Sequence, residues 1–289
     1  MIAMKSVSVI VPAYNEEAGI GKVVDQVLSI LKGTGWKHEV IVVNDGSTDR
    51  TGAVLKTKPV EIIEHGINRG YGASLKNGIA RAAFDYILIM DADGTYPEGA
   101  IPALLQEAER YDMVVGARTG TTVAIPPHRR FPKWCLKKLA DYLTGMKIPD
   151  LNSGLRVFTK TSALKFLNLL PSGFSFTTTI TVALLSNNYR VHYVPIDYHK
   201  RKGKSKFRPF QDTFNLFGLI VRTSLYFNPL KIFLPLSAGL FLLAVLILFY
   251  SKFFTPKVMD ITVIVVLMAS LQILALGLIA DLVDKRSQR

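Results

Sequence analysis

Two long apolar stretches near the C-terminus constrain this chain most. Residues 232–250 and 261–280 contain no charged side chain. As helices, each is long enough to cross a hydrocarbon core about 30 Å thick. The alternative is a pair of buried core helices, but soluble cores rarely need two such long uncharged runs. We therefore predict two transmembrane helices, at about 232–250 and 261–281, in a C-terminal region 229–289 that ends in a short basic tail.

The chain is strongly basic, with 35 Lys and Arg against 22 Asp and Glu and a formal net charge of +13. Six of the nine residues 200–208 are basic, and a second basic cluster lies in residues 129–138. Such clusters attract nucleic acids, phosphates or anionic lipid headgroups. Because two apolar stretches follow them, we expect anionic membrane lipids as partners and no nucleic acid.

The charge distribution also predicts an orientation. Basic residues are abundant before the first apolar stretch and in the tail, whereas the loop 251–260 has only Lys252 and Lys257. Cytoplasmic flanks of membrane helices carry the excess of Lys and Arg. The first residues do not follow a signal-peptide pattern, and one cysteine, Cys135, suits a reducing compartment. We expect a two-span integral membrane protein whose N-terminal domain and both termini are cytoplasmic.

The N-terminal part alternates between β-branched runs and helical stretches. Strands are predicted at 6–11, 39–43, 60–64, 86–90 and 113–115, and helices at about 17–31, 73–83 and 97–110. Short links between such elements are typical of an open, mostly parallel α/β sheet. Ligands of these folds bind beyond the carboxyl ends of the strands.

Two carboxylates follow the fourth predicted strand directly. Asp91 and Asp93 are separated by Ala92 and followed by Gly94. Two hard oxygen ligands suit Mg²⁺ or Mn²⁺, with water and substrate phosphate completing the coordination. The alternative is a solvated turn after a core strand. Polar loops also follow the first and second strands, which favours a ligand site at this edge.

Two further segments combine basic residues with features that suggest contact with membrane or phosphate. Residues 130–144 mix aromatic and basic side chains, as in a helix that lies in the membrane interface; an ordinary surface helix is the alternative. Residues 209–228 are predicted to form a second amphipathic helix next to the membrane. The basic loop 200–206, with Gly203 at its centre, could close over a diphosphate or simply hold anionic lipid.

Several short motifs occur in a fixed order along the first 210 residues or so. They are VIVPAYNE at 9–16, NDGSTD at 44–49, NRGYGAS at 68–74, DADG at 91–94, GAR at 116–118, LNSGLRVF at 151–158 and RKGKSK at 201–206. This ordered set resembles the polyprenyl-phosphate glycosyltransferases, the dolichyl-phosphate mannose synthase-like branch of the family-two inverting glycosyltransferases. The resemblance implies a GT-A-like catalytic domain over residues 1–208.

The resemblance also implies a donor site and a metal site. Asp91 and Asp93 would hold Mg²⁺ or Mn²⁺ and, through it, the donor diphosphate. Thr95 stands where the family often has a glutamine. The residues expected to contact the nucleotide sugar are Pro12, Tyr14, Glu16, Asp45, Gly70, Asp91, Ala92, Asp93, Arg201 and Lys206.

An acceptor site follows from the same resemblance. Arg118, Arg130 and Ser153 would hold the phosphate of an acceptor lipid, with Asp150 close by. Together with the two metal-site carboxylates, Arg118 and Arg130 form the predicted catalytic set. The sequence has no Q-x-x-R-W motif, which disfavours a processive polymer-forming enzyme.

The predicted reaction transfers one sugar from a UDP- or GDP-sugar to a dolichyl or undecaprenyl monophosphate, with inversion. Many relatives carry an acid where this chain has Thr177, Thr178 and Thr179. A phosphate acceptor needs no base, because its second pKa of about 6 leaves it anionic at neutral pH. A hydroxyl acceptor such as diacylglycerol, or a non-catalytic nucleotide-sugar-binding scaffold, is the alternative. The transmembrane helices could also join copies into a homo-oligomer.

Overall fold

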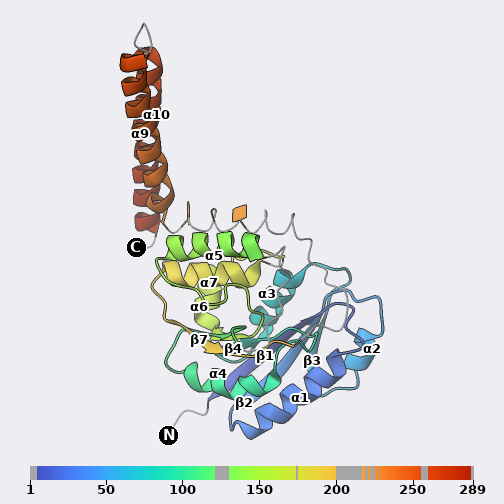
Figure 1. Ribbon diagram of the computed structural model, residues 1–289. Coiled ribbons are helices and arrows are strands. Elements are labelled where there is room, and N and C mark those ends of the chain that lie inside the picture. The colour runs from blue at the N-terminus through green and yellow to red at the C-terminus, as the bar shows by residue number, and fades with distance from the viewer. Residues whose placement is uncertain are drawn as a thin grey trace. The chain divides into compact units, whose positions relative to one another are not determined.

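The computed structural model describes residues 5–120, 130–173, 175–199, 217–218, 221, 225–226, 228–254 and 260–287 (Figure 1). The chain divides into two compact units, Met1–Ile220 and Val221–Arg289. The domain boundary predicted at residue 208 lies outside the described residues, as does most of the helix predicted at 209–228.

The described part of the first unit contains a seven-stranded sheet in the order β3-β2-β1-β4-β6-β5-β7. The strands are β1 Ser6–Ala13, β2 Lys37–Asn44, β3 Glu61–Glu64, β4 Tyr86–Ile89, β5 Met113–Ala117, β6 Arg156–Thr159 and β7 Val191–Pro195. Neighbouring strands are parallel except at β6, which runs antiparallel to both β4 and β5. The mostly parallel α/β sheet expected from the strand pattern is confirmed.

Helices lie on both faces of the sheet (Figure 1). They are α1 Ile20–Gly33, α2 Thr51–Leu55, α3 Tyr71–Arg81, η1 Glu98–Ala100, α4 Ile101–Glu107, α5 Arg130–Thr144, α6 Lys160–Phe166 and α7 Phe176–Ser186. The helix α1 buries residues spaced three or four apart, including Ile20, Val24 and Val27, as expected for an amphipathic helix packed on a sheet. The helix α6 was not among the sequence predictions.

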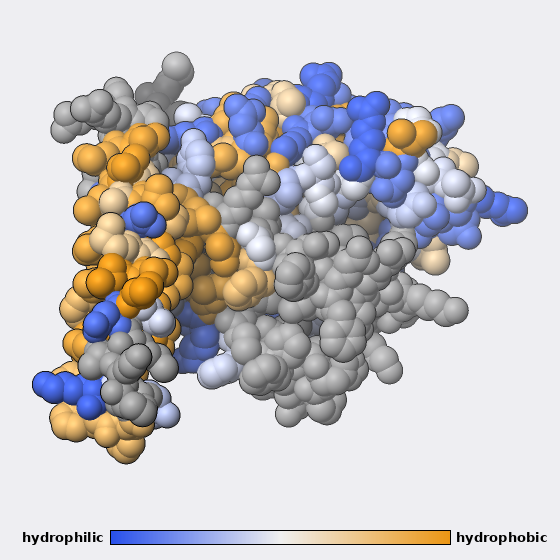
Figure 2. Space-filling model, turned by 90° about the horizontal axis from the view of Figure 1, so that it is seen from above, coloured by the Kyte–Doolittle hydropathy of each residue, from blue (hydrophilic) through white to orange (hydrophobic). Residues whose placement is uncertain are grey.

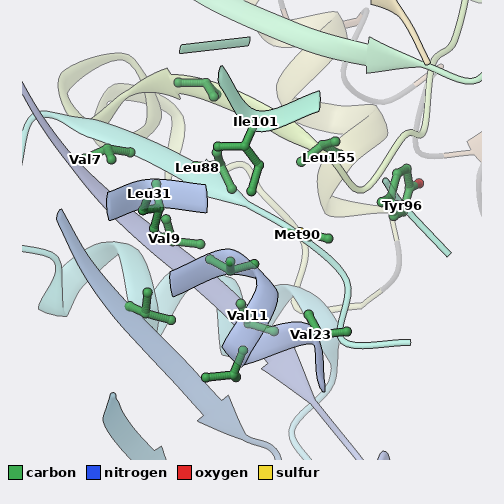
Figure 3. Close-up of a cluster of buried hydrophobic side chains, with 14 of the residues drawn as sticks. Val7, Val9, Val11, Val23, Leu31, Leu88, Met90, Tyr96, Ile101 and Leu155 are labelled. Atoms are coloured by element: carbon green, nitrogen blue, oxygen red, sulfur yellow. The ribbon is translucent and has the colours of Figure 1, made fainter. Parts of the chain in front are cut away.

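The alternation of side chains along β1 separates two packed layers. Val7, Val9 and Val11 belong to a buried cluster with residues of α1 and α4, such as Leu31 and Ile101 (Figure 3). The intervening residue of β1, Ile10, points to the opposite face, where α3 packs. A side chain at position 78 of α3 would overlap Ile10, which explains the glycine found there. Both faces of the sheet are therefore covered, so polar side chains can lie at its edges.

The second unit contains the helices α9, Leu230–Phe254, and α10, Asp260–Ser287. Both are long and apolar enough to cross a membrane, and they cover the two stretches predicted as spans. Among the described residues, α9 and α10 contact each other through small side chains. The Ser237 hydroxyl donates to the Ser270 carbonyl at 2.9 Å, and the Ser270 hydroxyl donates back at 3.0 Å. Such reciprocal bonds satisfy hydroxyls inside a helix pair without water.

Large apolar side chains cover the outside of this helix pair, seen as orange atoms in Figure 2. Leu242, Leu246 and Phe249 of α9 and Ile264 and Leu271 of α10 are all exposed by about half or more of their surface. An exposed apolar surface of this extent is unstable in water but suits hydrocarbon. The two helices therefore indicate a membrane protein.

Candidate functional site

The loops that follow β1 and β2 are joined by hydrogen bonds at the C-terminal edge of the sheet. The Asn15 amide donates to the Ser47 hydroxyl at 3.0 Å, and the Glu16 amide donates to the Thr51 hydroxyl at 2.9 Å. Asn15 adopts a left-handed conformation with φ of 54°, which asparagine tolerates better than most residues. These contacts place the half-buried side chains of Tyr14 and Glu16 at the same edge as the loop after β2.

Asp45 is the centre of a buried polar network behind this edge. Its side chain is 5% exposed, and its two oxygens accept hydrogen bonds from His65 Nδ1 at 2.7 Å and from the amides of Arg69 and Gly70 at 2.8 and 2.9 Å. Asn77 contacts the other ring nitrogen of His65 at 2.8 Å. Burial alone would raise the pKa of Asp45, but these donors outweigh it and lower the pKa below its usual value. The carboxylate therefore stays charged.

The two predicted metal-site acids lie just beyond the end of β4. The Asp93 carboxylate accepts bonds from the hydroxyl and the amide of the buried Thr95, at 2.6 and 3.1 Å. The Asp91 carboxylate accepts a bond from the Tyr71 hydroxyl at 2.8 Å. Burial, and then the neighbouring Asp91 charge, raises the pKa of Tyr71 well above its usual value, so the phenol keeps its proton. Both acids are thus held by side chains of the protein.

The composition of this acid pair fits a hard divalent ion. In the described part of the chain, no group of three or more His, Cys, Asp or Glu side chains could hold a metal by itself. Mg²⁺ commonly takes only one or two protein carboxylates and fills its other positions with water and substrate phosphate. Asp91 and Asp93, both half-buried at the open edge, provide that donor set. Thr95, which stands where the family often has a glutamine, donates hydrogen bonds to Asp93.

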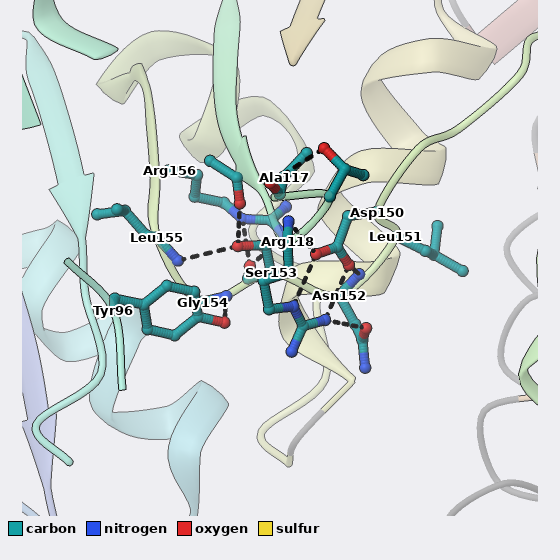
Figure 4. Close-up of polar contacts among 12 residues, drawn as sticks. Tyr96, Ala117, Arg118, Asp150, Leu151, Asn152, Ser153, Gly154, Leu155 and Arg156 are labelled. Carbon is teal, nitrogen blue, oxygen red and sulfur yellow. Dashed lines mark hydrogen bonds and ion pairs between the residues drawn. The ribbon is translucent and has the colours of Figure 1, made fainter. Parts of the chain in front are cut away.

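Arg118 and Asp150 form an ion pair with two side-chain hydrogen bonds (Figure 4). Arg118 Nε and Nη2 donate to the two Asp150 oxygens at 2.7 and 2.8 Å, and the Arg118 amide donates to Oδ2 at 3.0 Å. Nη2 also reaches Asn152 Oδ1 at 2.7 Å, and the guanidinium lies 5.2 Å from the ring centre of Tyr198. Burial alone would raise the pKa of Asp150, but Arg118 outweighs it and lowers the pKa. The arginine is therefore fixed in position before any ligand binds.

The turn between Asp150 and β6 is built on a buried arginine that the sequence reasoning did not single out. Arg156 is fully buried and donates to the Ser153 carbonyl from Nε at 3.0 Å, and from Nη1 to the Thr177 carbonyl and the Thr181 hydroxyl at 2.9 and 2.8 Å. The Ser153 hydroxyl donates to the Gly116 carbonyl at 2.6 Å. An arginine inside an apolar strand was the only sequence signal for this anchor.

Tyr96 connects this turn to the acid pair. Its hydroxyl accepts a bond from the Gly154 amide at 2.6 Å, as Figure 4 shows. Gly154 lies directly against Asp91, because a side chain at position 154 would overlap the Asp91 carboxylate. The structure thus brings together Asp91 and the turn that carries Asp150 and Ser153. Neither Tyr96 nor Tyr71 was predicted as a site residue.

The remaining predicted residues fall into two groups. Pro12 is buried in β1, Gly70 precedes α3, and Ala92 is buried between the two acids. Arg130 is the first residue of α5, while Arg201 and Lys206 lie outside the described residues.

Comparison with known proteins identifies the class of this site. The chain belongs to glycosyl transferase family 2, which matches residues 8–165. Residues 228–284 match the GtrB C-terminal hairpin family. The chain is therefore a glycosyltransferase with a C-terminal pair of apolar helices, and the resemblance drawn from the ordered motifs is confirmed.

Two individual relatives have names that describe the reaction they carry out. The chain is 28% identical to dodecaprenyl-phosphate galacturonate synthase of Rhizobium johnstonii, over 98% of this chain and 88% of that protein. It is 29% identical to dolichyl-phosphate hexose transferase of Haloferax volcanii, over 70% of this chain and 87% of that protein. Both names describe sugar transfer involving polyprenyl phosphates.

Solved structures show the same fold at lower identity. Glucosyl-3-phosphoglycerate synthase from Mycobacterium tuberculosis, in complex with Mn²⁺, UDP and phosphoglyceric acid, superimposes with a TM-score of 0.61 at 18% identity. The match covers 76% of this chain and 78% of that protein. The GT-A-like fold expected from the motifs is therefore confirmed.

Proposed function

We propose that this protein transfers a single sugar from a nucleotide diphosphate sugar to a polyprenyl monophosphate and forms a polyprenyl-phosphate monosaccharide. One observation carries the proposal: a carboxylate suited to a metal, Asp91, lies against the turn that carries Asp150, the ion-pair partner of Arg118. An acid and a fixed arginine at one sheet edge can hold two phosphate groups side by side. The polyprenyl-phosphate transferases among the relatives support the acceptor.

The donor side is assigned to the first half of the domain. Asp91 and Asp93 would hold Mg²⁺ or Mn²⁺, which when bound neutralises the diphosphate that leaves. The loops after β1 and β2 would contact the base and ribose. The residues assigned to the donor are Pro12, Tyr14, Glu16, Asp45, Gly70, Asp91, Ala92 and Asp93, together with Arg201 and Lys206.

Ser153, predicted as an acceptor residue, is fully buried and donates its hydroxyl proton to the Gly116 carbonyl, so it would shape the turn and not hold a phosphate. The acceptor side is therefore assigned to Arg118 and Arg130. Their role would be to hold the lipid phosphate so that one of its oxygens attacks the anomeric carbon. The bond from that carbon to the donor diphosphate breaks on the opposite side, and the configuration inverts. Thr177, Thr178 and Thr179 are buried in α7 and offer no base, but an anionic phosphate oxygen requires none. Positioning and charge neutralisation would then supply most of the catalysis.

A transfer assay tests the reaction directly. Purified full-length protein in detergent would be incubated with a short polyprenyl phosphate, Mg²⁺ or Mn²⁺, and a panel of UDP- and GDP-sugars. We expect mass spectrometry to detect one sugar-phosphate-lipid from one donor, and EDTA to abolish it until the metal is restored. Transfer to diacylglycerol, and not to the polyprenyl phosphate, would show that the proposed acceptor is wrong. Nucleotide binding without any product would favour the non-catalytic alternative.

We also propose that the catalytic domain and both termini are cytoplasmic and that α5 rests on the anionic membrane surface. Trp134 and Tyr142, two turns apart on α5, are 56% and 53% exposed, and Lys137 and Lys138 are exposed beside them. Aromatic rings and lysines arranged this way suit the headgroup region. The apolar outer surface of α9 and α10 would face lipid or a second copy of the chain.

Tryptophan fluorescence can test the membrane contact, because the chain has two tryptophans. In vesicles with brominated acyl chains and anionic headgroups, the full-length variant Trp36→Phe should show strong quenching of Trp134. The matched variant Trp134→Phe leaves only Trp36, which is 9% exposed in the core and should be quenched little. Equal quenching of the two variants would contradict the contact.

A further inference from the structure

The Asp91 carboxylate is confined from two sides. On one side, its Oδ1 accepts the 2.8 Å bond from the Tyr71 hydroxyl. On the other side, the backbone of Gly154 approaches so closely that an added side chain would overlap both carboxylate oxygens. A carboxylate held in this way cannot rotate freely, so the direction in which it presents its oxygens is set by its neighbours.

Tyr71 can act in this way because its own backbone is fixed. It is the first residue of α3, and the amides on either side of it are held: Gly70 donates to Asp45 Oδ2 at 2.9 Å, and Ala73 donates to the Ser172 carbonyl at 3.0 Å. Gly70 has a φ of 99°, and a side chain there would lie 2.7 Å from the Ser172 carbonyl oxygen. Only glycine meets both conditions.

The network around Asp45 extends this support into the core. Asn77, on α3 itself, contacts His65, which donates to Asp45. Asp45 in turn holds the segment that leads into Tyr71. A continuous series of hydrogen bonds therefore runs from α3 through Asp45 and the start of the helix to Asp91.

We propose that Tyr71 is a positioning residue that orients the Asp91 carboxylate for the metal and the donor diphosphate, and that Asp45 acts through Tyr71 as its anchor. This inference rests on the proposed function, since it assumes that Asp91 is a metal ligand. Partners that orient metal ligands in other proteins typically change metal affinity by about 10- to 100-fold when they are removed. Tyr71 and Asp45 would act in the same manner.

The variant Tyr71→Phe removes only the hydroxyl. Mn²⁺ binding to the full-length protein with UDP, followed by the spin-resonance signal of free Mn²⁺, should weaken about 10- to 100-fold. Transfer should recover substantially at high Mn²⁺. The matched control is Tyr86→Phe, which makes the same change at the opposite end of β4 and should bind Mn²⁺ like the wild type. Unchanged Mn²⁺ affinity in Tyr71→Phe would overturn the inference, whereas a wild type that binds no Mn²⁺ would overturn the proposed function.

The anchoring role of Asp45 needs a separate experiment, because Asp45 is also assigned to the donor nucleotide. If it acts through Tyr71, Asp45→Asn should weaken Mn²⁺ binding, and the double variant with Tyr71→Phe should bind no more weakly than the weaker single variant. UDP binding in EDTA, measured separately, reports how much Asp45 contributes to nucleotide binding without the metal. Additive losses of Mn²⁺ affinity, measured at saturating UDP, would overturn the anchoring role.

Discussion

Asp93→Asn is expected to lower the transfer rate by about a thousandfold or more, comparable to the loss of a principal electrostatic contact in other enzymes. Asparagine keeps the oxygen that accepts the two bonds from Thr95, so the loop should keep its shape. What disappears is one negative charge at the end of β4. Since a hard divalent ion depends on charged oxygens, metal and donor diphosphate would both bind poorly.

Steady-state transfer rates, measured over a range of Mg²⁺ and Mn²⁺ concentrations, check this expectation. Asp85→Asn is the matched control, because Asp85 is exposed at the start of β4 and the change in charge is the same. It should leave the rate within about twofold of the wild type, as for most surface changes. A nearly normal rate for Asp93→Asn would remove this carboxylate from the mechanism. Asp91→Asn should be similarly severe.

The second large effect concerns stability as well as activity. Asp150→Ala should lower the free energy of unfolding of the catalytic domain by about 3–5 kcal/mol, because it leaves the Arg118 guanidinium buried without its partner. The side chains of Arg118 and Asp150 are only 18% and 9% exposed, so water can replace little of the lost interaction. Transfer should also fall, since Arg118 would no longer be held for the acceptor phosphate.

Denaturant unfolding in detergent would measure this loss, with two comparisons. The exposed pair Lys58–Asp25 provides the control: Asp25, 58% exposed, should cost at most about 1 kcal/mol on conversion to alanine. The double variant Arg118→Met with Asp150→Ala should recover much of the stability but not the activity, because no buried charge remains unpaired. If the single variant Asp150→Ala were as stable as Asp25→Ala, the Arg118–Asp150 pair would not stabilise the domain as proposed.

The sheet could be predicted from the sequence because the local residue pattern of each strand indicates a strand. The runs that contain Val9, Val42 and Leu88 are mostly β-branched or apolar, and the acids and loops follow them directly. The strand β6 is short, and its antiparallel direction depends on pairing with β4 and β5, which no local pattern records. The prediction of a mostly parallel sheet is therefore correct, but the sequence did not show which strand is antiparallel.

The site was predictable to the extent that its residues lie in motifs. Asp91 and Asp93 could be singled out from their place after a strand, and Arg118 from the family resemblance of its motif. The structure shows partners for each. Tyr71 and Arg156 could not be singled out, because their contacts connect segments far apart in the chain. Tyrosine at the start of a helix and arginine in a strand usually have structural explanations, and only the three-dimensional arrangement identifies their neighbours.

The reversal of β6 has a consequence for how the two halves of the site are spaced. Because β6 runs antiparallel to β4, β6 begins at the edge of the sheet where β4 ends. The turn before Arg156 therefore starts beside the end of β4, where Ile89 pairs with Arg156. The distance between Asp91 and that turn is thus set by the register of one strand pair. A shift by one residue would move the turn by about 3.3 Å and invert which side chains face the core. The spacing between the residues proposed for the donor and those proposed for the acceptor is therefore as resistant to change as the hydrophobic core itself.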